Sequence, residues 1–219
     1  MARFALIRKK ERWSTTWLGK AMILFILILM VFIFVKTIHS FLSKNNPIAT
    51  EILVVEGFIP DYAIEACMQV FQNGNYKTLI ITGKKRLKGA HLDIYENDGE
   101  FSAATLEKLG FDRSKITIVA IDQDIQRDRT YTTAVALRNW MLEHHSMSSF
   151  NLATLDSHAR RSQLLFQKAF KDQNQIGIIA LENQSYDPDR WWQSSNGFRE
   201  VTKECIAWVY ARFFFNPSH

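Results

Sequence analysis

The sequence predicts an α/β domain with a five-stranded, mainly parallel sheet. Five short segments are almost wholly apolar and lack the alternation of polar and apolar residues that marks a half-exposed strand. A stretch whose apolar residues recur with helical spacing separates each segment from the next. Gly74 and Gly110 stand where two of these stretches end, as expected of glycine after a helix. Alternating strands and helices are typical of a parallel sheet covered by helices on both faces.

The elements follow in order along the chain. The expected strands are 51–57, 77–83, 115–121, 150–155 and 176–181. The expected helices are 61–74, 100–110, 129–145, a helix that opens after Leu155, and 199–215. Right-handed crossovers between parallel strands then give a Rossmann-like three-layer domain. Residues 84–97 have no clear period and form the longest expected loop, a kind of segment that is often functional.

A longer apolar segment precedes this domain. Residues 21–35 are all apolar, and with its flanks the segment extends over 17–42, which is long enough for a helix to cross a bilayer. Basic residues are concentrated before it, so the positive-inside rule places the N-terminus in the cytoplasm and the C-terminal domain outside it. No small-x-small cleavage site follows, so a retained single-pass anchor is favoured over a cleaved signal peptide.

These features divide the chain into four parts. We expect a basic cytoplasmic tail at 1–16, a transmembrane anchor at 17–42, a short polar linker at 43–50 and the α/β domain at 51–219. The lipid bilayer is therefore one expected partner. Much of the net charge of +5 lies in the tail and beside the anchor. The exported part is then near neutral, so no nucleic-acid partner is expected.

Two further features leave alternatives open. Cys67 and Cys205 are far apart, form no CxxC pair and match no zinc-site spacing. The apolar neighbours of Cys67 favour a buried, unreactive thiol, and a disulfide between the two cysteines is the alternative. The aromatic residues of 208–215 are interpreted mainly as core, with contact to a membrane surface as the alternative.

Polar residues cluster where four of the expected strands end. In open parallel sheets, ligands bind beyond the carboxyl ends of the strands. Asp122, Asp124 and Asp128 follow the third strand, but their spacing matches no metal-binding motif, so no metal site is expected. The other candidates are Glu56 and Gly57 after the first strand, Thr82 and Gly83 after the second, Arg129 and Thr130 after the third, and Asp156, Ser157, His158 and Arg161 after the fourth.

The corner after the fourth strand has an unusual charge pattern. Arg160 and Arg161 fall in the first turn of the expected helix, where positive charge opposes the helix dipole. A carboxylate or phosphate ligand would offset this cost. Alternatively, Asp156 or Ser157 caps the helix and the arginines face solvent. We expect His158 and Arg161 to face a ligand pocket, and Arg160 to face water or an acidic neighbour.

Four segments resemble the YdcF/SanA/ElyC family of bacterial envelope proteins. They read VVEGFIPDYAIEA, LIITG, DRTYTTAVALRNWM and SHARRSQLLFQKAF, and the resemblance covers about 51–215. Its most specific feature is the His-x-x-Arg pair, His158 and Arg161, and Thr130 also matches. Glu100 approximates the acidic residue at the start of the family's second helix. Lys84 departs from the pattern, because the family has a second glycine there.

The resemblance implies a role in cell-envelope biogenesis or barrier maintenance at the bacterial inner membrane. It also implies a pocket for a phosphorylated or otherwise anionic ligand, and no cofactor is assigned. In an enzyme, Arg161 and Arg129 would hold the phosphate and His158 would act as general acid or base, oriented by Asp156 or Glu56. In a binding protein, the same corner would hold a lipid headgroup or nucleotide without turnover. A non-catalytic accessory or scaffold protein is the alternative.

Overall fold

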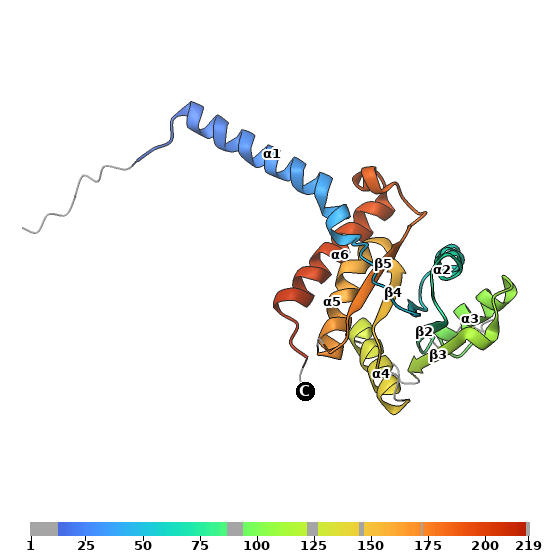
Figure 1. The fold of residues 1–219 in the computed structure, drawn as a ribbon. Coiled ribbons are helices and arrows are strands. Elements are labelled where there is room, and N and C mark those ends of the chain that lie inside the picture. Colours follow the sequence, from blue (N-terminus) through green and yellow to red (C-terminus); the bar gives the residue numbers. More distant parts are fainter. Residues whose placement is uncertain (1–12, 87–93, 122–126, 145–146, 172, 218–219) are drawn as a thin grey trace, which may run out of the picture. The chain divides into compact units, whose positions relative to one another are not determined.

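A computed structural model describes residues 13–86, 94–121, 127–144, 147–171 and 173–217 (Figure 1). The chain divides into two compact units, with the boundary between Thr37 and Ile38. The first unit contains most of α1 (Trp17–Leu42), a helix whose side chains are largely exposed and apolar. Its bounds confirm the expected apolar helix, and its length and composition suit it to cross a membrane.

The second unit contains a five-stranded sheet, and all of its strand pairs are parallel. The predicted α/β fold class is therefore confirmed. The spatial order is β3-β2-β1-β4-β5, so the chain reverses its direction of travel across the sheet between β1 and β4. Ligands bind at such a switch point in open α/β sheets. The strands are β1 (Ile52–Glu56), β2 (Thr78–Lys84), β3 (Ile116–Ile121), β4 (Phe150–Leu155) and β5 (Ile176–Leu181).

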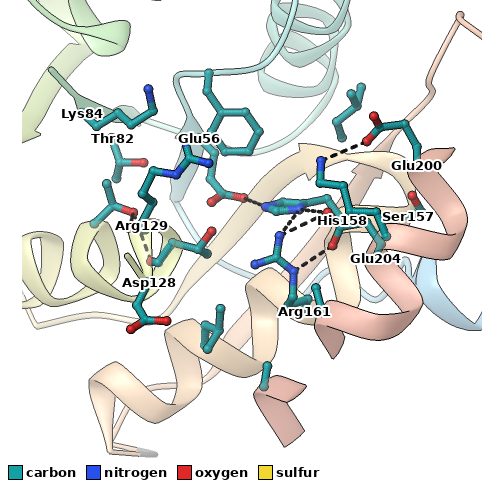
Figure 2. A pocket seen from close by; sticks show the side chains of 18 of the residues that line it. Glu56, Thr82, Lys84, Asp128, Arg129, Ser157, His158, Arg161, Glu200 and Glu204 are labelled. Atoms are coloured by element: carbon teal, nitrogen blue, oxygen red, sulfur yellow. Dashed lines mark hydrogen bonds and ion pairs between the residues drawn. The ribbon is translucent and has the colours of Figure 1, made fainter. Parts of the chain in front are cut away.

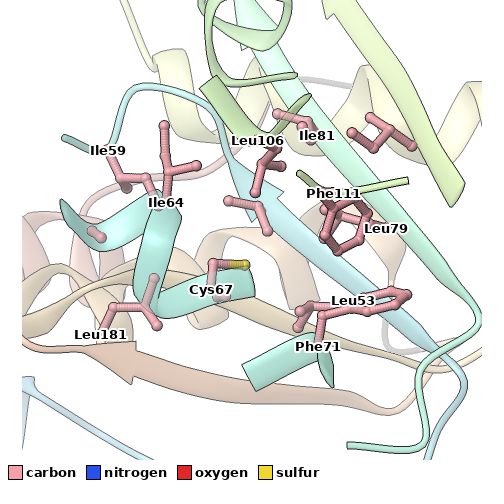
Figure 3. Packing of buried hydrophobic residues seen from close by; sticks show 14 of the residues in the cluster. Leu53, Ile59, Ile64, Cys67, Phe71, Leu79, Ile81, Leu106, Phe111 and Leu181 are labelled. Atoms are coloured by element: carbon pink, nitrogen blue, oxygen red, sulfur yellow. The ribbon is translucent and has the colours of Figure 1, made fainter. Parts of the chain in front are cut away.

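Helices cover both faces of this sheet, as Figure 1 shows. α2 and α3 pack on one face through a cluster that includes Leu53, Cys67 and Leu106 (Figure 3). α4 and α5 pack on the other face, where Val54 is buried beside Phe166. Neighbouring residues of β1 thus face opposite layers, which requires the apolar run seen in the sequence. The helices are α2 (Asp61–Asn73), α3 (Asp98–Lys108), α4 (Arg129–Glu143), α5 (Ala159–Phe170) and α6 (Ser195–Phe213), with α6 packed against α5.

The two cysteines are free thiols, so the alternative disulfide is not formed. Cys67 is buried in the α2 side of the core, and this burial raises the pKa of its thiol to about 12. The thiol is therefore protonated at neutral pH and serves as a small apolar side chain.

The residues expected as a linker pack along the second unit. Asn46 exchanges backbone hydrogen bonds of 2.8 and 3.1 Å with Ile178 on the edge strand β5. The side chain of Asn151 both accepts from Ile48 N and donates to Ile48 O, each at 2.8 Å. Gly177 leaves room for this arrangement, because a Cβ there would collide with the Asn151 amide and the Ile48 backbone. Packing thus extends the domain to the N-terminal side of residue 51.

The last turn of α1 also belongs to the second unit. Leu42 is fully buried, and Ile38 and His39 are buried beside it. Leu42 alone contributes about 1.5–3 kcal/mol by burial, which is typical of a core leucine. The sequence placed residues 38–42 in the transmembrane anchor, whereas the structure gives them contacts within the α/β unit.

Candidate functional site

A cavity of about 530 Å³ lies beyond the carboxyl ends of β1, β2 and β4. Its walls also include the start of α4, the first turns of α5 and one side of α6. On the α6 side the wall has a charged part, which includes Glu204, and an apolar part, which includes Ala207, Ala211 and Phe215. The predicted site residues that line it are Glu56, Thr82, Gly83, Arg129, Thr130, Ser157, His158 and Arg161.

His158 lies between two buried carboxylates (Figure 2). Its Nδ1 is 3.1 Å from Glu204 Oε1 and 2.9 Å from Arg161 Nη2. Its Nε2 is 3.6 Å from Glu56 Oε2, beyond hydrogen-bond distance. Nε2 is buried and has no hydrogen-bond partner among the described residues. A buried ring nitrogen without a partner in a native fold is a site that a ligand or water can satisfy.

The two ring nitrogens of His158 differ in hydrogen bonding, so they can play different chemical roles. If Nδ1 carries the proton, it donates to Glu204, and Nε2 has a lone pair that can accept a proton. If the ring is protonated, both nitrogens donate, and the imidazolium lies between Glu204 and Glu56. Because Nδ1 is already engaged, Nε2 is the nitrogen that can exchange a proton with a group in the cavity.

Glu204 is an ion-pair partner that sequence reasoning missed. Its two oxygens bind Arg161 at 2.8 Å from Nε and 3.1 Å from Nη2. Burial by itself would raise the pKa of Glu204, but the charges and hydrogen bonds of His158 and Arg161 more than offset it and hold the pKa well below its ordinary value. Glu204 is thus ionised at neutral pH, and Arg161 is paired within the protein.

Glu56 is held in place from α5. Its Oε2 accepts a hydrogen bond of 2.7 Å from Ser162 Oγ, and both side chains are buried. Ser162 was also missed, because a serine one turn into a helix carries no distinctive pattern. The hydroxyl fixes the Glu56 carboxylate on the Nε2 side of His158.

The cations around the cavity differ in how they are paired. Lys84 Nζ is 3.3 Å from Asp98 Oδ2, and Lys203 Nζ is 3.3 Å from Glu200 Oε2. The guanidinium of Arg129 has no hydrogen bond or ion pair with any residue in the described parts of the chain. In Figure 2 its side chain extends from the start of α4 toward the Glu56 side of the cavity. Arg129 is therefore the cation that an anionic ligand can reach without displacing a carboxylate.

Asp156 lies next to this site but does not line the cavity. Its Oδ2 is 2.9 Å from His39 Nε2 and accepts a hydrogen bond from Tyr186 OH. Burial would raise the pKa of Asp156, yet these partners hold it below its ordinary value. The structure thus places the carboxylate toward the last turn of α1, whereas the sequence offered Asp156 as one of two residues that orient His158.

Arg160 and Arg161 point to different surroundings. Arg160 lies 3.9 Å from the centre of the Phe41 ring and donates to the Phe41 carbonyl oxygen. The sequence predicted water or an acidic neighbour for Arg160, and the difference arises because the last turn of α1 packs here. Partial burial lowers the pKa of Arg160. Arg161 lines the cavity as predicted.

Glu100 serves as a helix cap. Its Oε2 accepts a hydrogen bond of 3.0 Å from Glu96 N, while Asn97 Oδ1 accepts one of 2.8 Å from Glu100 N. This reciprocal pair satisfies donors at the start of α3 and resembles a capping box. Glu100 does not line the cavity, so the structure brings it into no contact with His158 or Arg161.

Gly57 and Gly83 allow the start of α3 to approach the strands closely. A Cβ on Gly57 would lie 2.6 Å from Thr82 O, and a Cβ on Gly83 would collide with the backbone of Gly99. Gly57 also accepts a hydrogen bond of 2.7 Å from Ser102 Oγ through its carbonyl oxygen. Packing explains both glycines, and only Gly83 also lines the cavity.

The acidic residues after β3 give no metal site in the described part of the chain. Asp122 and Asp124 lie outside the described residues, and Asp128 lines the cavity. Within the described residues, no cluster of three or more His, Cys, Asp or Glu side chains is arranged to hold a metal ion.

One signal could have revealed Glu204 from the sequence. Val201, Glu204 and Ala211 follow helical spacing and are all buried on the inner face of α6. An acidic residue at a position of the apolar face needs a buried cation or donor as a partner. His158 and Arg161, already candidates, are the partners that it has.

Comparison of the chain with protein-family models, with curated proteins and with solved structures finds no match. The resemblance to the YdcF/SanA/ElyC family therefore stays a prediction.

Proposed function

We propose that the chain is a membrane-anchored cell-envelope protein of the YdcF/SanA/ElyC type, and that its α/β domain binds a phosphorylated or otherwise anionic ligand in the strand-end cavity. The observation that carries the proposal is that one cavity is lined by two groups without a hydrogen-bond partner among the described residues, the buried Nε2 of His158 and the guanidinium of Arg129. The N-terminus is cytoplasmic, and the domain lies on the outer side of the bacterial inner membrane.

The start of α4 supports anion binding. Arg129 and Thr130 are its first residues and line the cavity, and the first N–H groups of a helix have no partner within the helix. These donors and the positive end of the helix dipole favour an anion. A guanidinium adds a planar, bidentate donor suited to phosphate.

Carboxylates limit where the anion can lie. Glu204 neutralises Arg161, so a phosphate on Arg161 would have to displace a buried ion pair. An anion near Arg129 avoids that cost. If one of its oxygens reaches Nε2 of a protonated His158, the ring donates to it and separates it from Glu56. The apolar part of the wall along α6 accommodates an apolar part of the same ligand.

Turnover, where it occurs, requires a proton transfer at His158. Glu204 would hold Nδ1 and stabilise the imidazolium, while Nε2 gives or takes the proton. Glu56, fixed by Ser162, would orient a water or a substrate hydroxyl near Nε2. A binding protein of the envelope would use the same contacts without this step, so the two cases differ in turnover and share the binding site.

Thermal unfolding of the full-length protein in detergent tests ligand binding. The full chain is needed because residues 38–46 pack on the domain. The panel contains inorganic phosphate, nucleotides, sugar nucleotides and short polyprenyl phosphates. A ligand at 100 times its Kd adds about 2.7 kcal/mol to the free energy of unfolding, which gives a clear rise in Tm.

Two variants make this test specific. Arg129→Ala should abolish the rise in Tm, whereas Arg113→Ala should keep it, because Arg113 pairs with Glu107 away from the cavity. A rise unaffected by Arg129→Ala, or no rise with any anion, would overturn the proposal. Where a ligand is found, His158→Gln distinguishes an enzyme from a binding protein, since in an enzyme this variant loses turnover while ligand binding persists.

A reporter fused after His219 tests the orientation of the protein in the membrane. Reporter activity only in the cytoplasm contradicts the proposed orientation.

A further inference from the structure

The C-terminal helix α6 exposes a row of large apolar side chains. They follow one another at intervals of three, one, three and one residues, so they lie on one face of about two helical turns. The last of them directly follows the helix. We call this row the apolar stripe: Ile206, Val209, Tyr210, Phe213 and Phe214, with exposed fractions of 66%, 38%, 52%, 69% and 72%.

The stripe lies on the exposed side of α6, and Tyr210 is at its edge toward the cavity. Val201, Glu204 and Ala211 form the buried inner face, which packs toward α5 and the cavity. The sequence-based interpretation of 208–215 as mainly core is therefore wrong for the stripe residues of this segment, which are exposed. Contiguous exposed apolar residues of this size mark a surface that another phase or molecule covers.

The end of α1 lies beside the same helix. The ring of Phe41 packs edge-on against Trp208, with 4.9 Å between ring centres, and both residues belong to the second unit. Phe41 follows Val35, the last residue of the unbroken apolar run, by six positions. Six residues span at most about 20 Å even when fully extended. Because Trp208 contacts Phe41, only this short stretch of chain separates the contact from the segment suited to the bilayer.

The charges around the stripe fit an anionic lipid surface. Arg212 lies between the stripe residues in sequence and is exposed, and Lys203, which pairs with Glu200, is exposed one turn before Ile206. Aromatic and aliphatic residues with flanking cations are typical of helices that lie in the membrane interface. Among the possible occupants, a bilayer with anionic headgroups is within the reach of α1 and carries a charge that complements Arg212.

We propose that the apolar stripe of α6 docks on the surface of the bilayer that α1 enters, with anionic phospholipid headgroups as its partner. The proposal rests on the membrane anchoring in the proposed function. Docking gives the domain a second membrane contact besides α1. Tyr210 belongs to the stripe and also lines the cavity, so the docked surface adjoins the ligand site.

Fluorescence of the full-length protein in vesicles tests the docking. The vesicles contain phosphatidylcholine and phosphatidylglycerol, with or without brominated acyl chains that quench a nearby fluorophore. An environment-sensitive fluorophore is attached to one introduced cysteine in a Cys205→Ser background, since Cys67 is buried. The sites are Phe213→Cys on the stripe, Met30→Cys on α1 and Leu142→Cys on α4, the last a matched exposed apolar position with an exposed fraction of 51%.

Docking predicts loss of emission with brominated lipid at positions 213 and 30 and none at 142. Loss at 30 without loss at 213 overturns the docking and leaves the anchoring intact. No loss at either position overturns the anchoring as well. A blue-shifted emission at 213 that brominated lipid does not quench, and that disappears on dilution, shows that a second copy covers the stripe and also overturns the proposal.

Charge reversal provides a second measurement. Arg212→Glu should reduce the quenching at position 213 in vesicles with phosphatidylglycerol, and should have a smaller effect in phosphatidylcholine alone. The matched control is Arg190→Glu, because Arg190 is exposed in the segment before α6. If quenching is unchanged in Arg212→Glu, the claim that anionic headgroups are the partner of the stripe is wrong. Equal melting temperatures of the variants show that folding is not the cause.

Discussion

Asp156 and His158 lie two residues apart after β4, and their ionisable groups differ in how they are hydrogen-bonded. The Asp156 carboxylate faces the last turn of α1 and is held by His39 and Tyr186. The His158 ring faces the cavity, and its Nε2 has no hydrogen-bond partner among the described residues. A fully paired buried group stabilises the fold, whereas an open one adds a cost that a ligand can remove. The corner therefore has a structural side and a ligand-facing side.

On the structural side, the largest effect is expected at Asp156. Asp156→Ala leaves His39 and Tyr186 buried without their acceptor, and breaking such a buried pair costs about 3–5 kcal/mol in the free energy of unfolding. Asp156 also has a φ of 37°, a conformation that Asp and Asn adopt more readily than Ala does. Urea unfolding of the full-length protein in detergent measures the change.

Two control variants define this prediction. Asp156→Asn keeps the shape, the left-handed conformation and one acceptor oxygen, and it removes the charge, so it should cost less than Asp156→Ala. Glu182→Ala, on the exposed surface after β5, should change stability by less than about 0.5 kcal/mol. If Asp156→Ala were as mild as Glu182→Ala, the contacts of His39 and Tyr186 would contribute nothing, and the contrast within the corner would disappear.

An intermediate effect is expected at Glu204, which connects both arginine and histidine to α6. Its pKa in the folded protein lies below the ordinary value of 4.5, because His158 and Arg161 outweigh the effect of burial. The unfolded state therefore binds more protons in acid, so the stability from Glu204 is complete above the ordinary pKa and is lost as pH falls below it. Glu204→Gln should make the fall in stability between about pH 5 and pH 3 shallower.

The pH series must distinguish the loss of stability caused by protonation of Glu204 from the loss caused by protonation of other carboxylates. Asp156 also has a lowered pKa, so part of the acid loss should remain in Glu204→Gln. Urea unfolding at several pH values gives the slope for the wild-type chain, for Glu204→Gln and for the surface variant Glu182→Gln. Equal slopes for the wild type and Glu204→Gln would mean that the ion pair with Arg161 does not stabilise the folded state.

The sheet and the His158–Arg161 side of the corner could be predicted from the sequence, because both depend on local pattern. Apolar runs such as 150–155 predict buried parallel strands, and the strand ends predict where a cavity lies. The start of α3 differs by two residues, since Asn97 caps the helix and Asp98 begins it. Such shifts at helix ends are expected where the capping side chain decides the boundary.

The partners of this corner could not be predicted, because they come from distant parts of the chain. His39 contacts Asp156 across 117 residues, and Glu204 contacts Arg161 across 43. Sequence pattern indicates which side chains are unusual but not which of them meet. Arg160 illustrates the same limit: its neighbour Phe41 belongs to a helix that the pattern assigned wholly to the membrane.

The smallest effect on stability is expected at Arg129, on the ligand-facing side. Its guanidinium is exposed and has no ion pair within the described residues, and a cation at the start of α4 opposes the helix dipole. Arg129→Ala should therefore change the free energy of unfolding by less than about 0.5 kcal/mol, or increase it slightly. The same substitution at Arg161 leaves Glu204 buried without its bidentate partner and should cost about 3–5 kcal/mol.

The two arginines thus give a direct comparison within one cavity, measured by urea unfolding without ligand. If Arg129→Ala destabilises the protein as much as Arg161→Ala does, Arg129 is a structural residue and the ligand-facing side loses its free cation. If Arg129→Ala leaves the free energy of unfolding unchanged while Arg161→Ala lowers it, the charge of Arg129 does not stabilise the unliganded fold. A guanidinium that the fold does not need, in the wall of the same cavity as Nε2 of His158, is then available to bind a ligand.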